Sequence, residues 1–339
     1  MTRLNGKTPV ITGGAAAKRG MDAPTAVLIG VTGGLGHALA RLLAAEGFRM
    51  VLAARREYDA AALTGRSDGS AIYLRADVTD PASLEKLAAA AFEHLGRIDA
   101  VVNLAGISPR KSIEDYTPAD VDALLAVNVK GPIFVTQAFL PGLRKQAGGG
   151  VVVHIGGAMD GRVALPFMSA YAATRGALAS YVQGANRELA GTDVVLSFFG
   201  PVPSNTESES PYFDMWRKMG VALCEPDVVA REILATIRQR RRAHIMGGGL
   251  LKMLTLANAE SPSIAVASAR QSTGAEITGS IERGAGAGYT LAVQFTTSRD
   301  DAGPRTLHEI ALDSSDVIPA LGRLSQRLRE QFGESPTSI

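Results

Sequence analysis

Short apolar runs alternate with amphipathic segments through most of the chain. The runs that predict strands lie at residues 26–31, 49–54, 71–76, 100–104, 151–155 and 193–198. Apolar residues at helical spacing predict helices between them, at residues 35–46, 81–95, 118–143 and 169–189. Apolar runs without polar alternation are typical of strands buried on both faces. The pattern therefore predicts an α/β fold, a doubly wound parallel sheet with helices on both faces.

The start of the chain departs from this alternation. Val10-Ile11-Thr12-Gly13-Gly14 begins like a dinucleotide-binding loop, but no amphipathic helix and second strand follow it before Ala26. A phosphate site needs the helix whose N-terminus it uses, so we expect the glycine loop that begins at Gly30 to be the functional one. Residues 1–23 are therefore predicted to be an N-terminal extension.

The end of the chain departs from the alternation as well. Apolar and polar residues alternate from Tyr289 to Phe295 and predict a half-buried strand, which residues 308–312 can pair with after a turn at 300–304. Ser314 or Ser315 can then cap a helix. Its apolar positions are Val317, Leu321, Leu324, Leu328 and Phe332. We predict a dinucleotide-binding domain over residues 24–268 and a β-hairpin-plus-helix appendage over residues 269–339.

The composition is that of an ordinary globular protein, with 46% hydrophobic residues, 20% charged residues and a formal net charge of +2. That charge indicates no nucleic-acid surface, and the arginines at 238 and 240–242 are predicted to be a solvated helix end. The single cysteine, Cys224, excludes an internal disulfide. Residues 245–256 are too short to span a membrane, which takes about 20 apolar residues. We expect a cytoplasmic protein without nucleic-acid or membrane partners.

The strongest motif is the glycine loop Gly30-Val31-Thr32-Gly33-Gly34-Leu35-Gly36, between the first predicted strand and the first predicted helix. Glycines at 30, 34 and 36 permit a tight turn and let the backbone approach a pyrophosphate closely. The helix that follows directs unpaired N–H groups and the positive end of its dipole at that anion. Strand, glycine turn, helix and strand together predict a nucleotide-binding unit.

The end of the second predicted strand indicates which dinucleotide binds. An acidic residue there would hydrogen-bond the ribose 2′-hydroxyl, whereas Arg55 and Arg56 would meet a 2′-phosphate. The sequence therefore favours NADP(H) over NAD(H). The alternative is that both arginines are simply solvent-facing at the end of the strand.

Further motifs follow the glycine loop in order. They are Asp77-Val78, Asn103-Leu104-Ala105-Gly106, Asn128 within Val127-Asn128-Val129-Lys130-Gly131, Tyr171, and Phe199-Gly200-Pro201-Val202. With these motifs in this order and spacing, the chain resembles the short-chain dehydrogenase/reductase family over roughly residues 24–265. The resemblance implies a Rossmann-like fold. It also implies cofactor contacts from the glycine loop, Arg55, Arg56, Asp77, Val78, Asn103, Ala105, Gly106, Tyr171, Arg175, Gly200 and Val202.

The resemblance implies a catalytic set as well. In that family a tyrosine is the general acid or base, a lysine four residues later supports it and holds the nicotinamide ribose, a serine orients the substrate carbonyl, and an asparagine supports a proton relay. Asn128 and Tyr171 are retained here. Arg175 stands at the lysine position, and it keeps the charge but cannot release a proton. Asn128, Tyr171 and Arg175 are the candidate catalytic residues, and no metal site is expected.

The family's serine lies thirteen residues before its tyrosine, which gives Ala158 here, to within one residue. No serine occurs between His154 and Met168. His154, beside a buried strand, is expected to be a hydrogen-bonded core residue, and Asp160 is the best unconventional acid/base candidate. Tyr171 could instead be a packing residue, and Asn128 a satisfied polar residue or a helix bend.

Three functions are compatible with this altered site. The chain can be an NADP(H)-dependent oxidoreductase acting on a carbonyl or alcohol, with reduced turnover. It can catalyse a non-redox step, such as cyclisation, dehydration or isomerisation, with nucleotide bound. It can also be an inert cofactor-binding scaffold. Aromatic residues and methionines between residues 205 and 224 indicate a lid over an apolar small molecule, or a helix packed on the core. We also expect a homo-oligomer, built partly on the helices at 118–143 and 169–189.

Overall fold

The structure is a computed structural model that describes residues 23–161, 164–165, 167–218, 221–246, 269–270, 276–283, 289–296, 305–311 and 323. The chain divides into two compact units. The first unit consists of the chain up to Pro211 together with Cys224–Met246. The second unit consists of Tyr212–Leu223 and the chain beyond Met246. The predicted extension over residues 1–23 lies almost entirely outside the described residues, and the predicted domain boundaries stay predictions.

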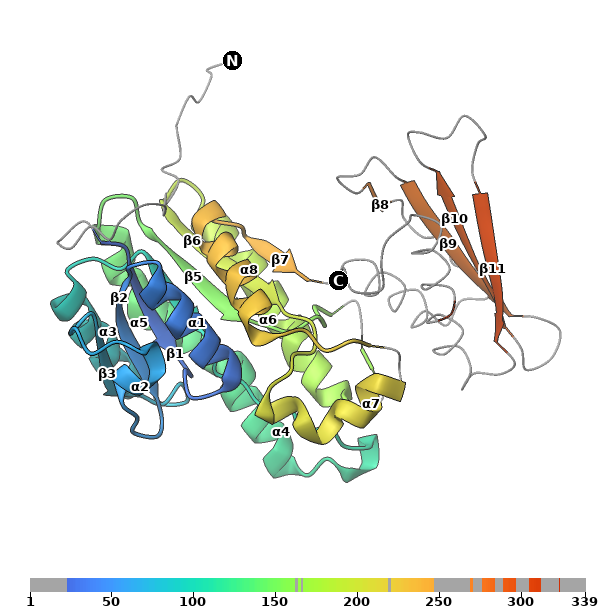
Figure 1. The fold of residues 1–339 in the computed structure, drawn as a ribbon, viewed down its shortest axis with the longest axis horizontal. Helices are drawn as coiled ribbons and strands as arrows, with labels where there is room; N and C mark the ends of the chain where they lie inside the picture. Colours follow the sequence, from blue (N-terminus) through green and yellow to red (C-terminus); the bar gives the residue numbers. More distant parts are fainter. Residues whose placement is uncertain are drawn as a thin grey trace, which may run out of the picture. The chain divides into compact units, whose positions relative to one another are not determined.

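The first unit is built on a seven-stranded sheet in the order β3-β2-β1-β4-β5-β6-β7 (Figure 1). Every neighbouring pair in it is parallel. The strands are β1 (Thr25–Ile29), β2 (Arg49–Ala54), β3 (Ala71–Arg75), β4 (Ala100–Asn103), β5 (Gly150–Ile155), β6 (Val194–Gly200) and β7 (Ala243–Ile245). The predicted doubly wound parallel sheet is thereby confirmed.

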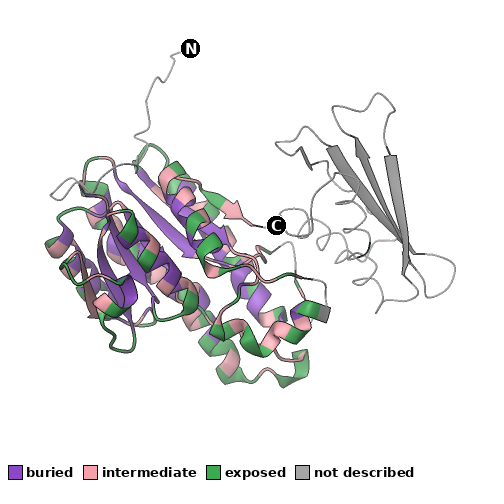
Figure 2. Ribbon diagram, viewed as in Figure 1, coloured by how far each residue is buried: buried purple, intermediate pink, exposed green. Residues whose placement is uncertain are grey.

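Helices cover both faces of this sheet. They are α1 (Gly34–Ala45), α2 (Ala60–Thr64), α3 (Pro81–Leu95), α4 (Pro118–Leu125), α5 (Gly131–Lys145), α6 (Ser169–Glu188) and α8 (Pro226–Gln239). One apolar core packs the sheet against α3, α5 and α6, and the other packs it against α1 and α8. In β1, Val27 belongs to the first core and Leu28 to the second, so the strands are buried on both faces (Figure 2).

In the first unit α2, β7 and α8 were not predicted, and one predicted helix is interrupted. The three-residue β7 is too short to give an apolar pattern, and of α8 only the arginine-rich end was foreseen. The predicted helix at 118–143 comprises α4, a π-helical turn over Ala126–Lys130 and α5. By length and composition Pro118–Lys145 could cross a membrane. Its apolar residues Val135, Phe139 and Leu143 pack in the core.

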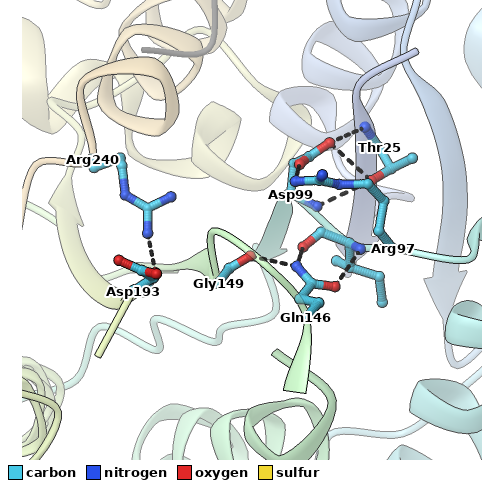
Figure 3. A network of polar contacts seen from close by, with 8 residues as sticks. Thr25, Arg97, Asp99, Gln146, Gly149, Asp193 and Arg240 are labelled. Atoms are coloured by element: carbon cyan, nitrogen blue, oxygen red, sulfur yellow. Dashed lines mark hydrogen bonds and ion pairs between the residues drawn. The ribbon is translucent and has the colours of Figure 1, made fainter. Parts of the chain in front are cut away.

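A polar network holds the amino ends of the strands together (Figure 3). Asp99, just before β4, accepts hydrogen bonds from the backbone and hydroxyl of Thr25 at the start of β1, at 2.9 and 3.1 Å. The Gln146 amide bridges the backbone of Ile98 and Gly149, ahead of β4 and β5. This network lies at the opposite edge of the sheet from the carboxyl ends, where ligands bind in open α/β sheets.

The second unit contains α7 (Phe213–Lys218) and a four-stranded antiparallel sheet in the order β11-β10-β9-β8. Its strands are β8 (Ala269–Arg270), β9 (Glu276–Arg283), β10 (Tyr289–Thr296) and β11 (Arg305–Ala311). The predicted hairpin is confirmed, with its return strand beginning at Arg305. The predicted turn at 300–304 falls outside the described residues. So does the predicted C-terminal helix except for Arg323, which is in helical conformation.

Candidate active site

The glycine loop joins β1 to α1 at the carboxyl edge of the sheet. Gly30 has φ +84°, and a Cβ atom there would lie 2.6 Å from the Ala105 backbone nitrogen. A Cβ at Gly36 would lie 2.3 Å from the carbonyl oxygen of Val31. Gly30 therefore permits close packing of the loop on the turn after β4, and Gly36 permits close packing of the loop on its own helix.

The other side of the loop is open. Thr32, Gly33 and Gly34 are exposed, and a Cβ at Gly33 would meet nothing within 4 Å. The helix that begins at Gly34 has 12 residues and no acidic residue in its first turn. An accessible helix N-terminus with free amide groups and no local anion fits a pyrophosphate.

Arg55 and Arg56 follow β2 directly and are exposed. Their backbones are anchored: Arg75 donates to the Arg55 carbonyl at 3.1 Å, and the Tyr73 hydroxyl donates to the Arg56 carbonyl. Among the residues that the structure describes, neither guanidinium has an ion-pair partner. Both charges are therefore accessible to an anionic ligand. The sequence did not predict a nearby contact, in which the ring of His37 on α1 lies 5.5 Å from that of Tyr58.

Asp77 and Val78 follow β3, and both are engaged by the fold. The Asp77 carboxylate accepts from the Thr79 amide and hydroxyl at 2.9 and 2.8 Å, which closes a turn. Val78 is buried and packs at Gly131, where an added Cβ would lie 3.2 Å from the valine side chain. The hydrogen bonds of Asp77 go to Thr79, Asp80 and Ser83, and among the described residues none goes to the glycine loop.

Asn103, at the end of β4, and Gly106, just after it, lie between the glycine loop and the candidate catalytic residues. The buried Asn103 side chain accepts from the Ala105 amide at 3.2 Å, which shapes the turn that touches Gly30. A Cβ at Gly106 would lie 2.8 Å from Arg175 Nη2 and 3.5 Å from Asn128 Oδ1. The structure thus brings Gly106, Asn128 and Arg175 together.

Asn128 sits in the π-helical turn and is fully buried. Its Oδ1 accepts from the Ile107 amide at 3.0 Å, and its Nδ2 donates to the Ile107 carbonyl at 2.9 Å and to the Thr174 hydroxyl at 3.2 Å. π-helical turns are frequent at functional sites because they re-aim side chains and carbonyls. Both Nδ2 protons are used here, so the side chain holds the loop after β4 against α6.

Tyr171 and Arg175 lie one turn apart on α6 and are both buried. The Tyr171 hydroxyl donates to the Gly156 carbonyl at 3.3 Å, and the Arg175 Cζ lies 4.7 Å from the centre of the Tyr171 ring. Arg175 Nη1 donates to the Ile155 carbonyl at 3.4 Å, while its buried Nε has no hydrogen-bond partner among the described residues. A buried cation with an unused donor fits a polar ligand group at this point.

The loop after β5 carries no hydroxyl next to the tyrosine. A Cβ at Gly157 would lie 2.7 Å from the Tyr171 hydroxyl oxygen, so Gly157 faces that group. The sequence placed the serine equivalent at Ala158, to within one residue, and the structure puts the preceding residue against the phenol. Because Gly157 has φ +98°, a side chain there would be strained as well as crowded. Sequence spacing alone could not detect this one-residue shift.

The end of β6 closes the site from the other side. A Cβ at Gly200 would lie 2.6 Å from the Gly157 carbonyl oxygen, and the Val202 carbonyl accepts from Ser204 at 3.0 Å. Further on, the Thr206 methyl lies 3.0 Å from a Cβ built at Gly34. The segment after β6 therefore contacts the glycine loop, which the sequence did not predict.

Other predicted polar groups lie elsewhere. His154 is fully buried, and its Nε2 lies 2.9 Å from the Thr136 hydroxyl, which itself donates to the Pro132 carbonyl. Burial lowers the pKa of His154 to about 3, so the imidazole is a neutral core group, as expected. Arg238 pairs with Glu46, and Arg240 donates to the Asp193 carbonyl. The described residues contain no group of His, Cys, Asp and Glu suited to a metal ion.

Comparisons with known proteins support one family. A family model described as short chain dehydrogenase matches residues 24–215. An uncharacterized oxidoreductase of Staphylococcus epidermidis is 33% identical over 176 residues, 52% of this chain and 76% of that protein. A short chain dehydrogenase from Burkholderia cenocepacia, solved in complex with NADP, is 28% identical with a TM-score of 0.58, over 66% of this chain and 95% of that one.

A more distant structure has the same fold. The 3-ketoacyl-(acyl-carrier-protein) reductase from Brucella melitensis, complexed with NADH, has a TM-score of 0.61 at 22% identity, over 68% of this chain and 99% of that one. The matched family model covers more than half of the chain, including the glycine loop, Asn128, Tyr171 and Arg175. This chain belongs to the short-chain dehydrogenase family of oxidoreductases.

Proposed function

We propose that this protein is an NADP(H)-dependent oxidoreductase that interconverts a carbonyl and an alcohol on an apolar small molecule. The observation that carries the proposal is the buried stack of the Arg175 guanidinium on the Tyr171 ring, at 4.7 Å. It stands at the carboxyl edge of a sheet whose glycine loop is open to a pyrophosphate. The NADP bound by the Burkholderia cenocepacia relative supports the same cofactor class.

Tyr171 would exchange a proton with the substrate oxygen. The Arg175 charge stabilises negative charge that develops on the phenol oxygen, because Coulomb attraction is strong in a buried site. A guanidinium does not release its proton in proteins, so Arg175 would orient and stabilise the Tyr171 phenol without acting as an acid itself. Asn128 fixes the loop after β4 against α6 and thereby the position of Gly106 beside Arg175.

The bound dinucleotide would supply or accept the hydride. The α1 N-terminus at Gly33–Leu35 would hold its pyrophosphate, and the free Nε of Arg175 would face its nicotinamide ribose. Arg55 and Arg56 would hold a 2′-phosphate with charge-assisted hydrogen bonds, which favours NADP(H) over NAD(H). Val78 and Val202 would provide apolar contacts.

A non-redox reaction is the second candidate, and Gly157 favours it. In a redox mechanism a hydroxyl beside the tyrosine would polarise the substrate carbonyl, and the residue that faces Tyr171 has no side chain. The nucleotide would then be a structural element, with Tyr171 acting in a cyclisation, dehydration or isomerisation. An inert nucleotide-binding scaffold is the third possibility, since a fold does not fix an activity.

The deciding experiment measures nucleotide binding and turnover separately. Purified protein is titrated with NADPH by fluorescence and then incubated with NADPH and a panel of apolar ketones and aldehydes. We expect binding, slow NADPH oxidation, and a loss of at least about 100-fold in turnover in Tyr171→Phe at unchanged affinity. Binding without oxidation of any carbonyl would favour the non-redox candidate. Absence of binding would refute the proposal.

The protein is further proposed to be a cytoplasmic homo-oligomer that binds neither nucleic acid nor membranes. The near-neutral charge and the internal contacts of Arg238 and Arg240 support the absence of a polyanion surface. The apolar character of the substrate is inferred from the composition of residues 205–224, in which Tyr212, at the end of a 3₁₀ turn, and Phe213 and Met215, on α7, are partly exposed. Trp216 is buried, which supports a packing role for that residue, and Met219 lies outside the described residues.

A further inference from the structure

We propose that Arg110 and Glu209 form a positioning pair that ties the glycine loop to the start of the helix that carries Tyr171. Arg110 follows β4, and Glu209 lies in the segment after β6, 99 residues away. Both segments lie at the carboxyl edge of the sheet. The role proposed for the pair at the nucleotide rests on the proposed function; the mechanical link stands without it.

The ion pair is buried and well formed. Arg110 Nη2 lies 3.1 Å from Glu209 Oε1 and 2.8 Å from Oε2. The Arg110 side chain is 4% exposed and that of Glu209 is 22% exposed, which makes Arg110 the most buried cation of the described ion pairs. Separating the two side chains would leave a buried charge without a partner, which is strongly destabilising. The ion pair therefore holds the two segments together.

From Glu209 the link continues to the nucleotide loop. The Glu209 amide donates to the Thr206 carbonyl at 3.0 Å. Thr206 in turn places its methyl 3.0 Å from a Cβ built at Gly34, the first residue of α1. The position of Glu209 therefore sets how the segment after β6 lies on the helix end where a pyrophosphate would bind.

From Arg110 the link continues to the catalytic helix. The amide of Lys111 donates to the Phe167 carbonyl at 2.9 Å, and the Tyr116 hydroxyl lies between the Pro109 and Phe167 carbonyls, at 3.1 and 3.4 Å. Phe167 has φ +63°, an uncommon value for a bulky residue, and α6 begins two residues later at Ser169. Strained backbone persists where its surroundings over-determine it, which points to a functional constraint four residues before Tyr171.

The link thus runs from Gly34 through Thr206 and Glu209 to Arg110, and from there through Phe167 to the helix of Tyr171. Occupation of the glycine loop and the placement of the phenol are coupled through one ion pair. Coupling between two sites through such a contact is typically worth a factor of about 5–150 in affinity.

The mechanical link is tested first, without nucleotide. Hydrogen exchange is compared in wild type, Glu209→Gln, Arg110→Lys and the control Lys111→Ala, whose neighbouring pair with Asp120 (2.6 Å) is more exposed. We expect faster exchange at residues 204–210 and also at 167–172 in both Glu209→Gln and Arg110→Lys, and not in the control. Faster exchange confined to residues 204–210 would overturn the proposal. If Arg110→Lys fails to fold, Glu209→Gln alone decides.

The coupling is tested next with NADPH as the probe. Glu209→Gln is expected to weaken NADPH affinity at least about fivefold and to shift the pH profile of turnover, with Lys111→Ala unchanged. The charge-reversed double variant Arg110→Glu with Glu209→Arg should recover part of the affinity. Additive losses in the double variant, or equal losses in the control, would overturn the coupling. A wild type that fails to bind NADPH refutes the proposed function instead, and the exchange result still decides the mechanical link.

Discussion

The guanidinium of Arg175 stacks on the ring of Tyr171, with its Cζ 4.7 Å from the ring centre. Where the family has a flexible ammonium group, this site has a planar cation fixed against the phenol and against the Ile155 carbonyl. The stack keeps a positive charge beside the acid/base group. It also occupies the space next to Gly106, where an added Cβ would lie 2.8 Å from Nη2. Compared with the family's lysine, Arg175 therefore keeps the positive charge beside the tyrosine but presents it in a different geometry.

We predict that the double variant Ala158→Ser with Arg175→Lys reduces simple ketones with NADPH at least about tenfold faster than wild type, or about 1.4 kcal/mol in barrier. The hydroxyl adds a donor for the substrate oxygen, and lysine restores a flexible ribose contact. The measurement is the initial rate of NADPH oxidation. Gly157→Ser is the matched comparison and should be slower than wild type, because its Cβ would crowd Tyr171 at 2.7 Å. A folded, NADPH-binding double variant without a gain would show that other features limit redox chemistry.

Cofactor preference is predicted to reside in Arg55 and Arg56. Both side chains are exposed while their carbonyls are held by Arg75 and Tyr73, so alanine substitution removes charge with little effect on the fold. Losing two charge-assisted contacts should weaken NADPH binding at least about tenfold and leave NADH binding nearly unchanged. Fluorescence titrations with both nucleotides measure this. Equal affinities in the wild type, or an unchanged preference in the double variant, would contradict the assignment.

The glycine loop is predicted to tolerate a methyl group at one position and not at another. Gly36→Ala would place a Cβ 2.3 Å from the Val31 carbonyl and should cost about 1–3 kcal/mol of unfolding free energy. Gly33→Ala has open space and φ −89°, so its stability should change by less than about 0.5 kcal/mol. The free energy of unfolding of both variants is measured in urea. Equal destabilisation of the two would show that the loop adjusts to a methyl group at either position.

The burial of His154 predicts a pH-dependent loss of stability. Its pKa is lowered to about 3 in the fold from an ordinary value of 6.5, so the unfolded chain binds one more proton between these values. Stability from this group is complete above pH 6.5 and declines as the pH falls, by about 2 kcal/mol at pH 5. His154→Asn removes the titrating group and should flatten that decline in urea unfolding at pH 7 and pH 5. An equally steep decline in the variant would assign it to other groups.

A homo-oligomer is predicted to form partly through the helices at 118–143 and 169–189, which correspond to α4, α5 and α6. On α6, Ala173 and Ala177 are exposed and permit close approach of a second helix, whereas Gly176 already packs on Gly161. Ala173→Arg with Ala177→Arg should give a monomeric mass by light scattering at micromolar concentration. Ala62→Arg on the exposed side of α2 is the control and should leave the mass unchanged. A monomeric wild type would contradict the prediction.

The sequence by itself determined the elements that depend on local signals. A helix was predicted at residues 81–95, and α3 has these bounds, because the Asp80 side chain caps it, Pro81 starts it and Gly96 ends it with φ +77°. The second strand also has its predicted bounds, since a doubly buried strand shows as an uninterrupted apolar run. The same local logic identified the glycine loop and the motifs that belong to it.

Only the tertiary structure decided how the candidate site is assembled. That Gly157 faces Tyr171, that Asn128 is held by Ile107 and Thr174, and that Arg110 meets Glu209 all depend on contacts between segments far apart in the chain. Sequence spacing fixes a residue only to within one position in a loop, because a loop's path is set by what it packs against. The strand β7 shows the same dependence: its three residues have no pattern of their own and become a strand through pairing with β6.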